Sequence, residues 1–222
     1  MTKTVVLNLL GGVAWLALTG AILFGCAWRS DLPMFWAYLG VWTATFLVAV
    51  FVTDPTLGKE RMRPGPGGKD YGTLVAATLV WPGQLVVAGL DVGRFHWSDT
   101  VPLAVQLIAL LAMAAALAVM VWATAVNRFF SSVIRIQTDR GHQLVTSGPY
   151  RFVRHPAYAS CPFLLIGGGL ALGSWLAALI GLLMVLMILR RTALEDRVLR
   201  EQLEGYAAYA QKVRYRVFPG VW

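Results

Sequence analysis

The stretch NRFFSSVIRIQTDRGHQLVTSGPYRFVRHPAY, residues 127–158, decides how this chain folds. It contains five arginines and two histidines and lies between two long apolar runs. Polar side chains are therefore concentrated where the chain leaves one apolar run and enters the next. A second polar cluster, RRTALED at residues 190–196, follows the last apolar run. The two clusters can meet only if the chain between them returns to the same side of a membrane.

The composition is that of a membrane protein. The 222 residues are 58% hydrophobic and 14% charged, with a mean hydropathy of +0.64. Soluble domains typically contain about 45–50% apolar and about 25% charged residues, so the sequence predicts a polytopic membrane protein. Both cysteines, Cys26 and Cys161, lie in apolar runs. We expect them to be buried apolar side chains rather than a disulfide or metal ligands, and no metal site is predicted.

Four apolar runs precede the quoted stretch, at about residues 5–27, 33–53, 72–90 and 101–126. Each is close to the ~20 residues that a helix needs to cross ~30 Å of hydrocarbon. The first run is longer than the ~7–15 residue core of a secretion signal, so we expect it to remain a membrane helix. Residues 1–126 are therefore predicted to form an N-terminal part of four transmembrane helices.

The last apolar run, residues 157–189, decides the topology. As one helix it would be about 50 Å long, too long for a single crossing. A hairpin turning near Gly173 leaves only Arg29 and Arg94 of the lysines and arginines outside, which the positive-inside bias favours. We therefore predict an all-α protein with about six transmembrane segments, the last two a short hairpin. Both termini and any active site are predicted to face the cytoplasm.

The net charge of +8 then lies mostly on the anionic cytoplasmic leaflet. Contact with membrane lipids explains most of these charges, and nothing in their arrangement suggests nucleic acid. The loop that contains Arg61 and Arg63 also carries the sequence PGPGG at residues 64–68, which is typical of a turn-rich connection.

Residues 127–158 are richer in polar groups than orientation requires. We expect an ordered loop with a short extended piece at residues 133–136. Pro156 is suited to the first position of the next helix, which places His155 beside a helix N-terminus that can hold a carboxylate or phosphate. The alternative for His155 is a capping or interfacial histidine. For Tyr150 and Tyr158 the alternative is an interfacial tyrosine.

Arg191 and Glu195 are four residues apart and share a helix face at the inner membrane surface. A structural ion pair is the simple interpretation. A carboxylate where a helix leaves the bilayer is costly, however, which favours a functional role. Residues 196–204 alternate in charge between apolar side chains, which predicts an amphipathic helix on the membrane. Tyr206 and Tyr209 would either anchor this helix or close over a ligand.

Together these segments resemble a known family. GHQLVTSGPYRFVRHPAY (residues 141–158), an apolar hairpin, RTALED (191–196), a glycine four residues before Tyr209, and VRYRVFPGVW (213–222) are similar to the isoprenylcysteine carboxyl methyltransferase family. The wider superfamily of integral membrane enzymes includes phospholipid N-methyltransferases. The resemblance covers the chain from Asn127 onward, and two positions depart from it: Ser160 stands where many members have glycine, and Asp196 replaces a second glutamate.

The resemblance implies S-adenosyl-L-methionine as cofactor, with S-adenosyl-L-homocysteine as product. No strand followed by GxGxxG is present, so the soluble dinucleotide fold is not expected. By similarity Glu195 contacts the cofactor, and Arg191 lies near the carboxylate of the substrate, so these two are the predicted catalytic residues. The remaining predicted cofactor-binding residues are Gln137, His142, Gln143, Leu144, Val145, Tyr150, His155, Pro156, Ala157 and Tyr158.

Residues 127–222 are thus predicted to be the catalytic part: ordered loop, hairpin and C-terminal helix. The implied activity is methyl transfer to a lipophilic acceptor, a small molecule or a lipid-modified substrate, with a carboxylate as the methylated group. One alternative is N-methylation of a phospholipid or amine, for which Glu195 would serve as base. Another is a non-catalytic scaffold that binds anionic lipids. The sequence leaves the oligomeric state open.

Overall fold

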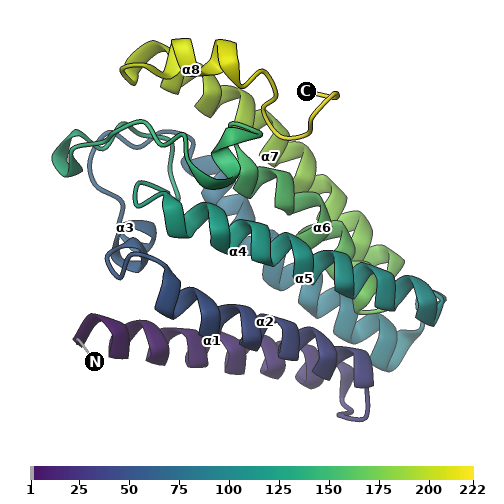
Figure 1. Ribbon diagram of the computed structural model, residues 1–222. Coiled ribbons are helices and arrows are strands. Elements are labelled where there is room, and N and C mark those ends of the chain that lie inside the picture. The colour runs from purple at the N-terminus through teal and green to yellow at the C-terminus, as the bar shows by residue number, and fades with distance from the viewer. Residues whose placement is uncertain (1–2) are drawn as a thin grey trace.

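The computed structural model describes residues 3–222 as a bundle of helices (Figure 1). Five helices are long and apolar enough to cross a membrane: α1 (Lys3–Ala27), α2 (Pro33–Val52), α4 (Tyr71–Leu90), α5 (Leu103–Val126) and α7 (Trp175–Gln202). The sixth, α6 (Pro156–Ala171), is apolar but has only 16 residues. It is about 24 Å long, less than the ~30 Å hydrocarbon core. The predicted all-α polytopic fold is confirmed.

Short elements join these helices. They are α3 (Leu57–Met62), the π-helical turn η1 (Asp91–Phe95), the 3-10 turns η2 (Thr138–Arg140) and η3 (Gly148–Arg151), and α8 (Tyr206–Lys212). In Figure 1, α3, the loop between α5 and α6, and α8 lie at one end of the bundle, while the α1–α2 and α6–α7 turns lie at the other. We call residues 127–155 the connector. The fold therefore brings the connector and the end of α7 to the same end of the molecule.

The predicted hairpin is present, and glycine permits its close packing. The turn between α6 and α7 contains Gly173 with φ of +88°, a conformation that glycine adopts readily. A Cβ atom on Gly169 would lie 2.3 Å from the Ala178 nitrogen, and one on Gly181 would lie 2.3 Å from the Leu165 oxygen. The backbones of α6 and α7 thus touch where side chains are absent, as is common between membrane helices.

Buried polar groups fix the hairpin to α4. Gln84 on α4 donates from its amide nitrogen to the carbonyls of Leu165 and Ala177, at 2.6 and 2.8 Å. Asp91, which is fully buried, accepts hydrogen bonds from the Ser98 and Ser174 hydroxyls, both at 2.5 Å. Polar groups in apolar surroundings are costly unless paired, so these contacts specify one register of the hairpin against α4.

The main core lies across both predicted parts of the chain. Leu23 from α1, Phe35 from α2 and Leu85 from α4 are packed in one cluster with Met113 from α5 and Leu172 beyond α6. Residues 1–126 and 127–222 therefore share a hydrophobic core. This shared core fixes the positions of α4 and α7 relative to each other, and polar side chains lie between these two helices.

The C-terminal region differs in detail from the expected surface helix. Residues 196–202 continue α7 without a break, and a separate helix, α8, begins at Tyr206. Gly205 makes the turn between them with φ of +78°. Asp196, expected on an amphipathic surface helix, is only 1% exposed, because α8 and the C-terminal residues fold back over it. This cover creates a buried polar centre.

Candidate functional site

The start of α6 is fixed by the end of the chain. Pro156 occupies the first turn of the helix, as predicted, and His155 precedes it. The backbone N–H groups of Arg154 and His155 donate to the carbonyls of Tyr215 and Arg216, at 3.0 and 2.8 Å. The His155 side chain does not cap the helix. Its ring is free to face other elements.

The buried carboxylate of Asp196 collects side chains from four segments. Its partners are Arg154 Nε at 2.7 Å, Arg200 Nε and Arg216 Nε at 3.1 Å each, the Tyr206 hydroxyl at 3.0 Å, and His155 Nε2 at 3.4 Å. A buried charge requires such pairing. Three guanidinium groups around one carboxylate leave an excess of positive charge, so the centre joins the connector, α7, α8 and the C-terminal residues and remains attractive to an anion.

Tyr158 lies between the two predicted catalytic residues. Its hydroxyl donates to Glu195 Oε2 at 2.6 Å and accepts a hydrogen bond from Arg191 Nε at 2.8 Å. Among the described residues, no ion pair joins Arg191 directly to Glu195. The phenol of α6 thus bridges two α7 side chains one turn apart and holds them in a fixed arrangement.

Arg191 is also held from the opposite side. It is buried, its Nη2 donates to the Ser132 carbonyl at 2.9 Å, and its Nη1 lies 3.5 Å from Asp70 Oδ2. That Asp70 oxygen is buried and has no hydrogen-bond partner in residues 3–222. The planar guanidinium is therefore oriented by α6, the connector and the start of α4, an arrangement that a lysine could not reproduce.

The connector is ordered by a buried ion-pair group. Arg135 pairs with Glu60 through two hydrogen bonds of 3.0 Å and with Asp139 at 2.7 Å. The bonds to Glu60 and Asp139 raise the pKa of Arg135 further above its usual value. Burial alone would raise the pKa of Glu60, but the bonds from Arg135 and Ser131 outweigh it, so this carboxylate is charged at neutral pH.

The extended piece expected at residues 133–136 is partly formed. Ile134 makes an isolated antiparallel bridge with Lys69, with backbone hydrogen bonds of 2.9 and 3.2 Å. Gln137 is fully buried, and its side chain bonds to the Phe129 carbonyl and to Arg140. Its amide therefore serves the internal structure of the connector.

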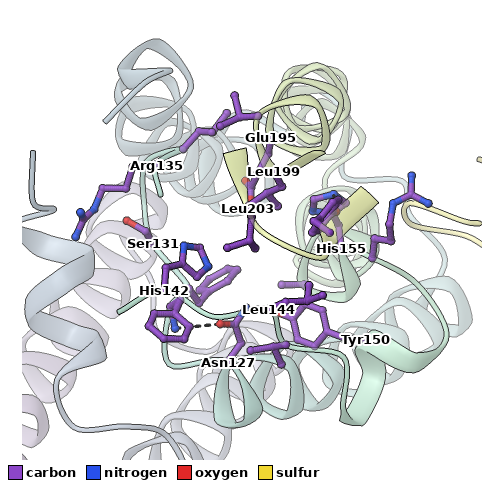
Figure 2. Close-up of a pocket in the computed structure, with 18 of the residues that line it drawn as sticks. Asn127, Ser131, Arg135, His142, Leu144, Tyr150, His155, Glu195, Leu199 and Leu203 are labelled. Atoms are coloured by element: carbon purple, nitrogen blue, oxygen red, sulfur yellow. Dashed lines mark hydrogen bonds between the residues drawn. The ribbon is translucent and has the colours of Figure 1, made fainter. Parts of the chain in front are cut away.

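A cavity lies between the connector, the start of α6, the end of α7 and α8. We call it the connector cavity (Figure 2). It contains about 760 Å³ of space between atoms, its open mouth included. Figure 2 shows Glu195 and Leu199 of α7, and Leu203 just after it, facing His142 and Leu144 of the connector across this space.

Most of the predicted cofactor-binding residues line this cavity. They are His142, Gln143, Leu144, Val145, Tyr150, His155, Ala157, Tyr158 and Glu195. Gln137 and Pro156 do not line it. Gln137 is turned into the connector, and Pro156 is buried at the first turn of α6. The fold thus brings together side chains that are up to about fifty residues apart in the sequence.

Other residues that line the cavity were not among the predicted site residues. They are Asn127, Phe129, Phe130, Ser131, Val133, Ile134, Arg135, Arg154, Val198, Leu199, Leu203, Tyr206 and Tyr209. The apolar ones on α7 lie at helical spacing from Glu195, which is a usable signal. The aromatic and serine residues after Asn127 carry no such signal, because the connector path places them there.

His142 is held as a neutral ring. The Gln137 backbone N–H donates to its Nδ1 at 3.3 Å, and its ring centroid lies 4.6 Å from that of Phe129. Burial, together with the charges of Arg135 and Arg140, lowers the pKa of His142 to about 4. The connector cavity therefore presents an uncharged imidazole at neutral pH.

The tyrosines of the cavity are protonated hydrogen-bond donors. Burial raises the pKa of Tyr150, of Tyr206 and of Tyr209 well above the usual value. Tyr209 donates to the Tyr150 carbonyl at 2.6 Å, and Asn127 donates to the Tyr150 hydroxyl at 3.0 Å. Tyr206 and Tyr209 thus anchor α8 and also line the cavity.

A second cavity adjoins the first on its membrane side. It lies between α3, α4, α5, α6, α7 and the connector and is called the membrane cavity. It contains about 650 Å³ of space between atoms, its open side included. Phe130, Ser131, Ala157 and Tyr158 line both cavities, and Arg191 lines the second. The Arg191–Tyr158–Glu195 chain thus lies at their common wall. Among residues 3–222 no group of three or more His, Cys, Asp or Glu side chains is placed to hold a metal ion.

Comparison with known proteins finds one family whose model matches part of the chain. Residues 104–201 match the model of the isoprenylcysteine carboxyl methyltransferase (ICMT) family. A solved structure of the eukaryotic intramembrane Ras methyltransferase ICMT is similar, with 17% identity, 95% of this chain and 75% of that chain covered, and a TM-score of 0.49. No curated protein matches the sequence. The match over residues 104–201 spans a little under half of the chain and shows that this part is similar to the isoprenylcysteine carboxyl methyltransferase family.

Proposed function

We propose that the protein transfers a methyl group from S-adenosyl-L-methionine to a lipophilic acceptor, with a carboxylate as the methylated group. The observation that carries this proposal is the bridge from Arg191 through Tyr158 to Glu195, placed between the connector cavity and the membrane cavity. One cavity suits a polar cofactor and the other an apolar chain. The residues of the bridge are the ones that would touch both reactants.

The connector cavity fits the charges of this cofactor. Glu195 can accept the cofactor ammonium through a charge-assisted hydrogen bond. The positive excess around Asp196, presented through Arg154 and His155, suits the cofactor carboxylate. Neutral His142 and the apolar walls would hold the rest without repelling a sulfonium. When bound, S-adenosyl-L-methionine would supply an electrophilic methyl group.

The residues of the bridge would act mainly by positioning. Arg191 can orient an acceptor carboxylate by two parallel hydrogen bonds. A carboxylate is already deprotonated, so little proton transfer is needed, and exclusion of water and alignment would supply most of the acceleration. Attack of an anion on a sulfonium neutralises charge, which a dry site favours. For an amine acceptor, Glu195 is placed to take up the proton.

Two experiments test the proposal. Calorimetry of the folded, detergent-solubilised protein with S-adenosyl-L-homocysteine should show binding, whereas a scaffold that binds only anionic lipid should show none. Incubation with methyl-labelled cofactor and either an S-prenyl thioether carboxylate or an aminophospholipid separates O- from N-methylation. A methyl ester releases its label in base, and a methylated amine retains it. Absence of transfer to either acceptor would overturn the assignment.

The proposed orientation places the connector, α8 and both termini in the cytoplasm. Residues 1–126 would form the membrane scaffold and residues 127–222 the catalytic part. Single cysteines at Thr146, Gln211 and Ser30, each exposed, would test the topology in a background lacking Cys26 and Cys161. A membrane-impermeant maleimide added to intact cells should label only the Ser30 position. Labelling of Thr146 and Gln211 from opposite sides would contradict the hairpin.

A further inference from the structure

The membrane cavity has a polar end and an apolar end. Thr73, Arg61 and Arg191 line it, together with apolar residues such as Leu74, Met184 and Ile188. Arg61 comes from α3, Thr73 from the first turn of α4, and Arg191 from α7. Two cations and a hydroxyl therefore face a space whose other walls are mostly apolar. Such a space suits an amphiphile with an anionic head.

Thr73 is unusual among the helical threonines of this chain. It is 3% exposed, and its hydroxyl has no hydrogen-bond partner among the described residues. By contrast, Thr19, Thr43, Thr45, Thr78, Thr124 and Thr192 donate to carbonyls three or four residues earlier. The carbonyl four residues before Thr73 belongs to Lys69 and already accepts from the Ile134 N–H. A buried hydroxyl without a partner is costly, so it points to a ligand group.

Arg61 is unusual among the cations of the site. Its guanidinium lies 5.2 Å from the centroid of the Phe130 ring, and no carboxylate pairs with it in the part of the chain that the structure describes. Arg61 is exposed at the surface of the protein and also lines the cavity. Among the described residues, the one carboxylate within ion-pair distance of Arg191 is Asp70, at 3.5 Å. Two like charges facing one cavity are stabilised when an anion lies between them.

We propose that Arg61 and Thr73 are specificity-determining residues that hold the anionic head of the acceptor against Arg191. Thr73 donates a hydrogen bond to an anionic oxygen, Arg61 supplies a second positive charge, and the apolar walls hold the tail. This inference rests on the proposed function, because it places the acceptor in the membrane cavity. It adds that α3 and α4, outside the residues 104–201 that match the family, select the acceptor.

The test uses Thr73→Val, which removes the hydroxyl and keeps the shape, and Arg61→Gln. Equilibrium binding of an S-prenyl thioether carboxylate, of its neutral carboxamide and of an aminophospholipid is measured without methyl donor. A hydrogen bond to a charged group predicts that Thr73→Val weakens carboxylate binding by about tenfold or more. Both variants should bind the carboxamide as the wild type does. The same loss with the phospholipid would identify a phosphate as the recognised anion.

Matched controls separate this role from folding. Thr73→Ser keeps the hydroxyl and should restore affinity to within about threefold. Thr78→Val on the same helix, and Arg63→Gln near Arg61, should leave binding unchanged. All variants should bind S-adenosyl-L-homocysteine with the affinity of the wild type. If the wild type itself does not bind S-adenosyl-L-homocysteine, that result counts against the proposed function alone. Wild-type affinity of both Thr73→Val and Arg61→Gln for each anionic amphiphile would overturn the present inference.

Discussion

The Tyr158 hydroxyl lies 2.6 Å from Glu195 Oε2 and 2.8 Å from Arg191 Nε, so one phenol joins two charged side chains that do not touch each other. The two residues belong to α7, and the phenol belongs to α6. The close packing of α6 against α7 through Gly169 and Gly181 makes this contact possible. The geometry of the site therefore depends on the packing of the hairpin.

Removing the bridge should lower catalysis without unfolding the protein. Tyr158→Phe deletes the hydroxyl that fixes Arg191 and Glu195, and each hydrogen bond to a charged group contributes about 1.5–3 kcal/mol. We expect kcat to fall by about tenfold or more. Tyr71→Phe, at an exposed position at the start of α4, is the control. Equal turnover of Tyr158→Phe and wild type would show that the bridge has no catalytic role.

Substitutions of Glu195 and Arg191 on α7 should impair different steps, cofactor binding and turnover respectively. Glu195→Ala removes the proposed partner of the cofactor ammonium and should weaken S-adenosyl-L-homocysteine binding, measured by calorimetry. Arg191→Ala should mainly lower turnover, because it orients the acceptor. Glu201→Ala, an exposed position on the same helix, serves as control. If both site variants keep full activity, the site lies elsewhere.

The Asp196 centre should be essential for stability. Asp196→Asn leaves the guanidinium groups of Arg154, Arg200 and Arg216 without their common carboxylate. Breaking a buried ion pair typically costs about 3–5 kcal/mol. We expect a loss of this order in the free energy of unfolding, measured by denaturant titration in detergent. Glu204→Gln, which is exposed, should change stability little.

His142 should make stability dependent on pH. Its pKa is about 4 in the folded protein, against about 6.5 in the unfolded chain. Between these values the unfolded chain binds a proton that the folded chain does not, so stability falls as pH is lowered through this window. His142→Asn should reduce the difference between the unfolding temperatures at pH 7 and pH 5. An unchanged difference for His142→Asn would contradict the buried neutral ring.

Replacing the glycines of the hairpin with larger residues should destabilise the protein. A Cβ on Gly181 would meet the Leu165 carbonyl at 2.3 Å, so Gly181→Ala should destabilise the protein by about 1–3 kcal/mol. Gly40→Ala, where no atom lies within 4 Å of the new Cβ, should be neutral or stabilising, because alanine favours helix. Thermal unfolding of the two variants in the same detergent compares them directly.

Most of the residues predicted to bind the cofactor from the family segments line the connector cavity, among them His142, His155 and Glu195. Gln137 does not line the cavity, because the number of residues in a loop does not reveal which side chains it turns inward. Asp196 lay in the predicted motif, but its burial followed from α8 and the C-terminal residues folding over it. Arg61 and Thr73 carried no sequence signal, since a lone arginine and a lone threonine are common in such segments.

The sequence by itself determined the helices, the hairpin and the class of the protein. The length of each apolar run is a local property, and the cost of exposing backbone in a membrane leaves helix as the available structure. Tertiary structure alone decided that Tyr158 joins Arg191 to Glu195, and that α3 and α4 complete the membrane cavity. Those contacts link residues far apart in the chain, and only the packing of the helices against one another brings them within reach.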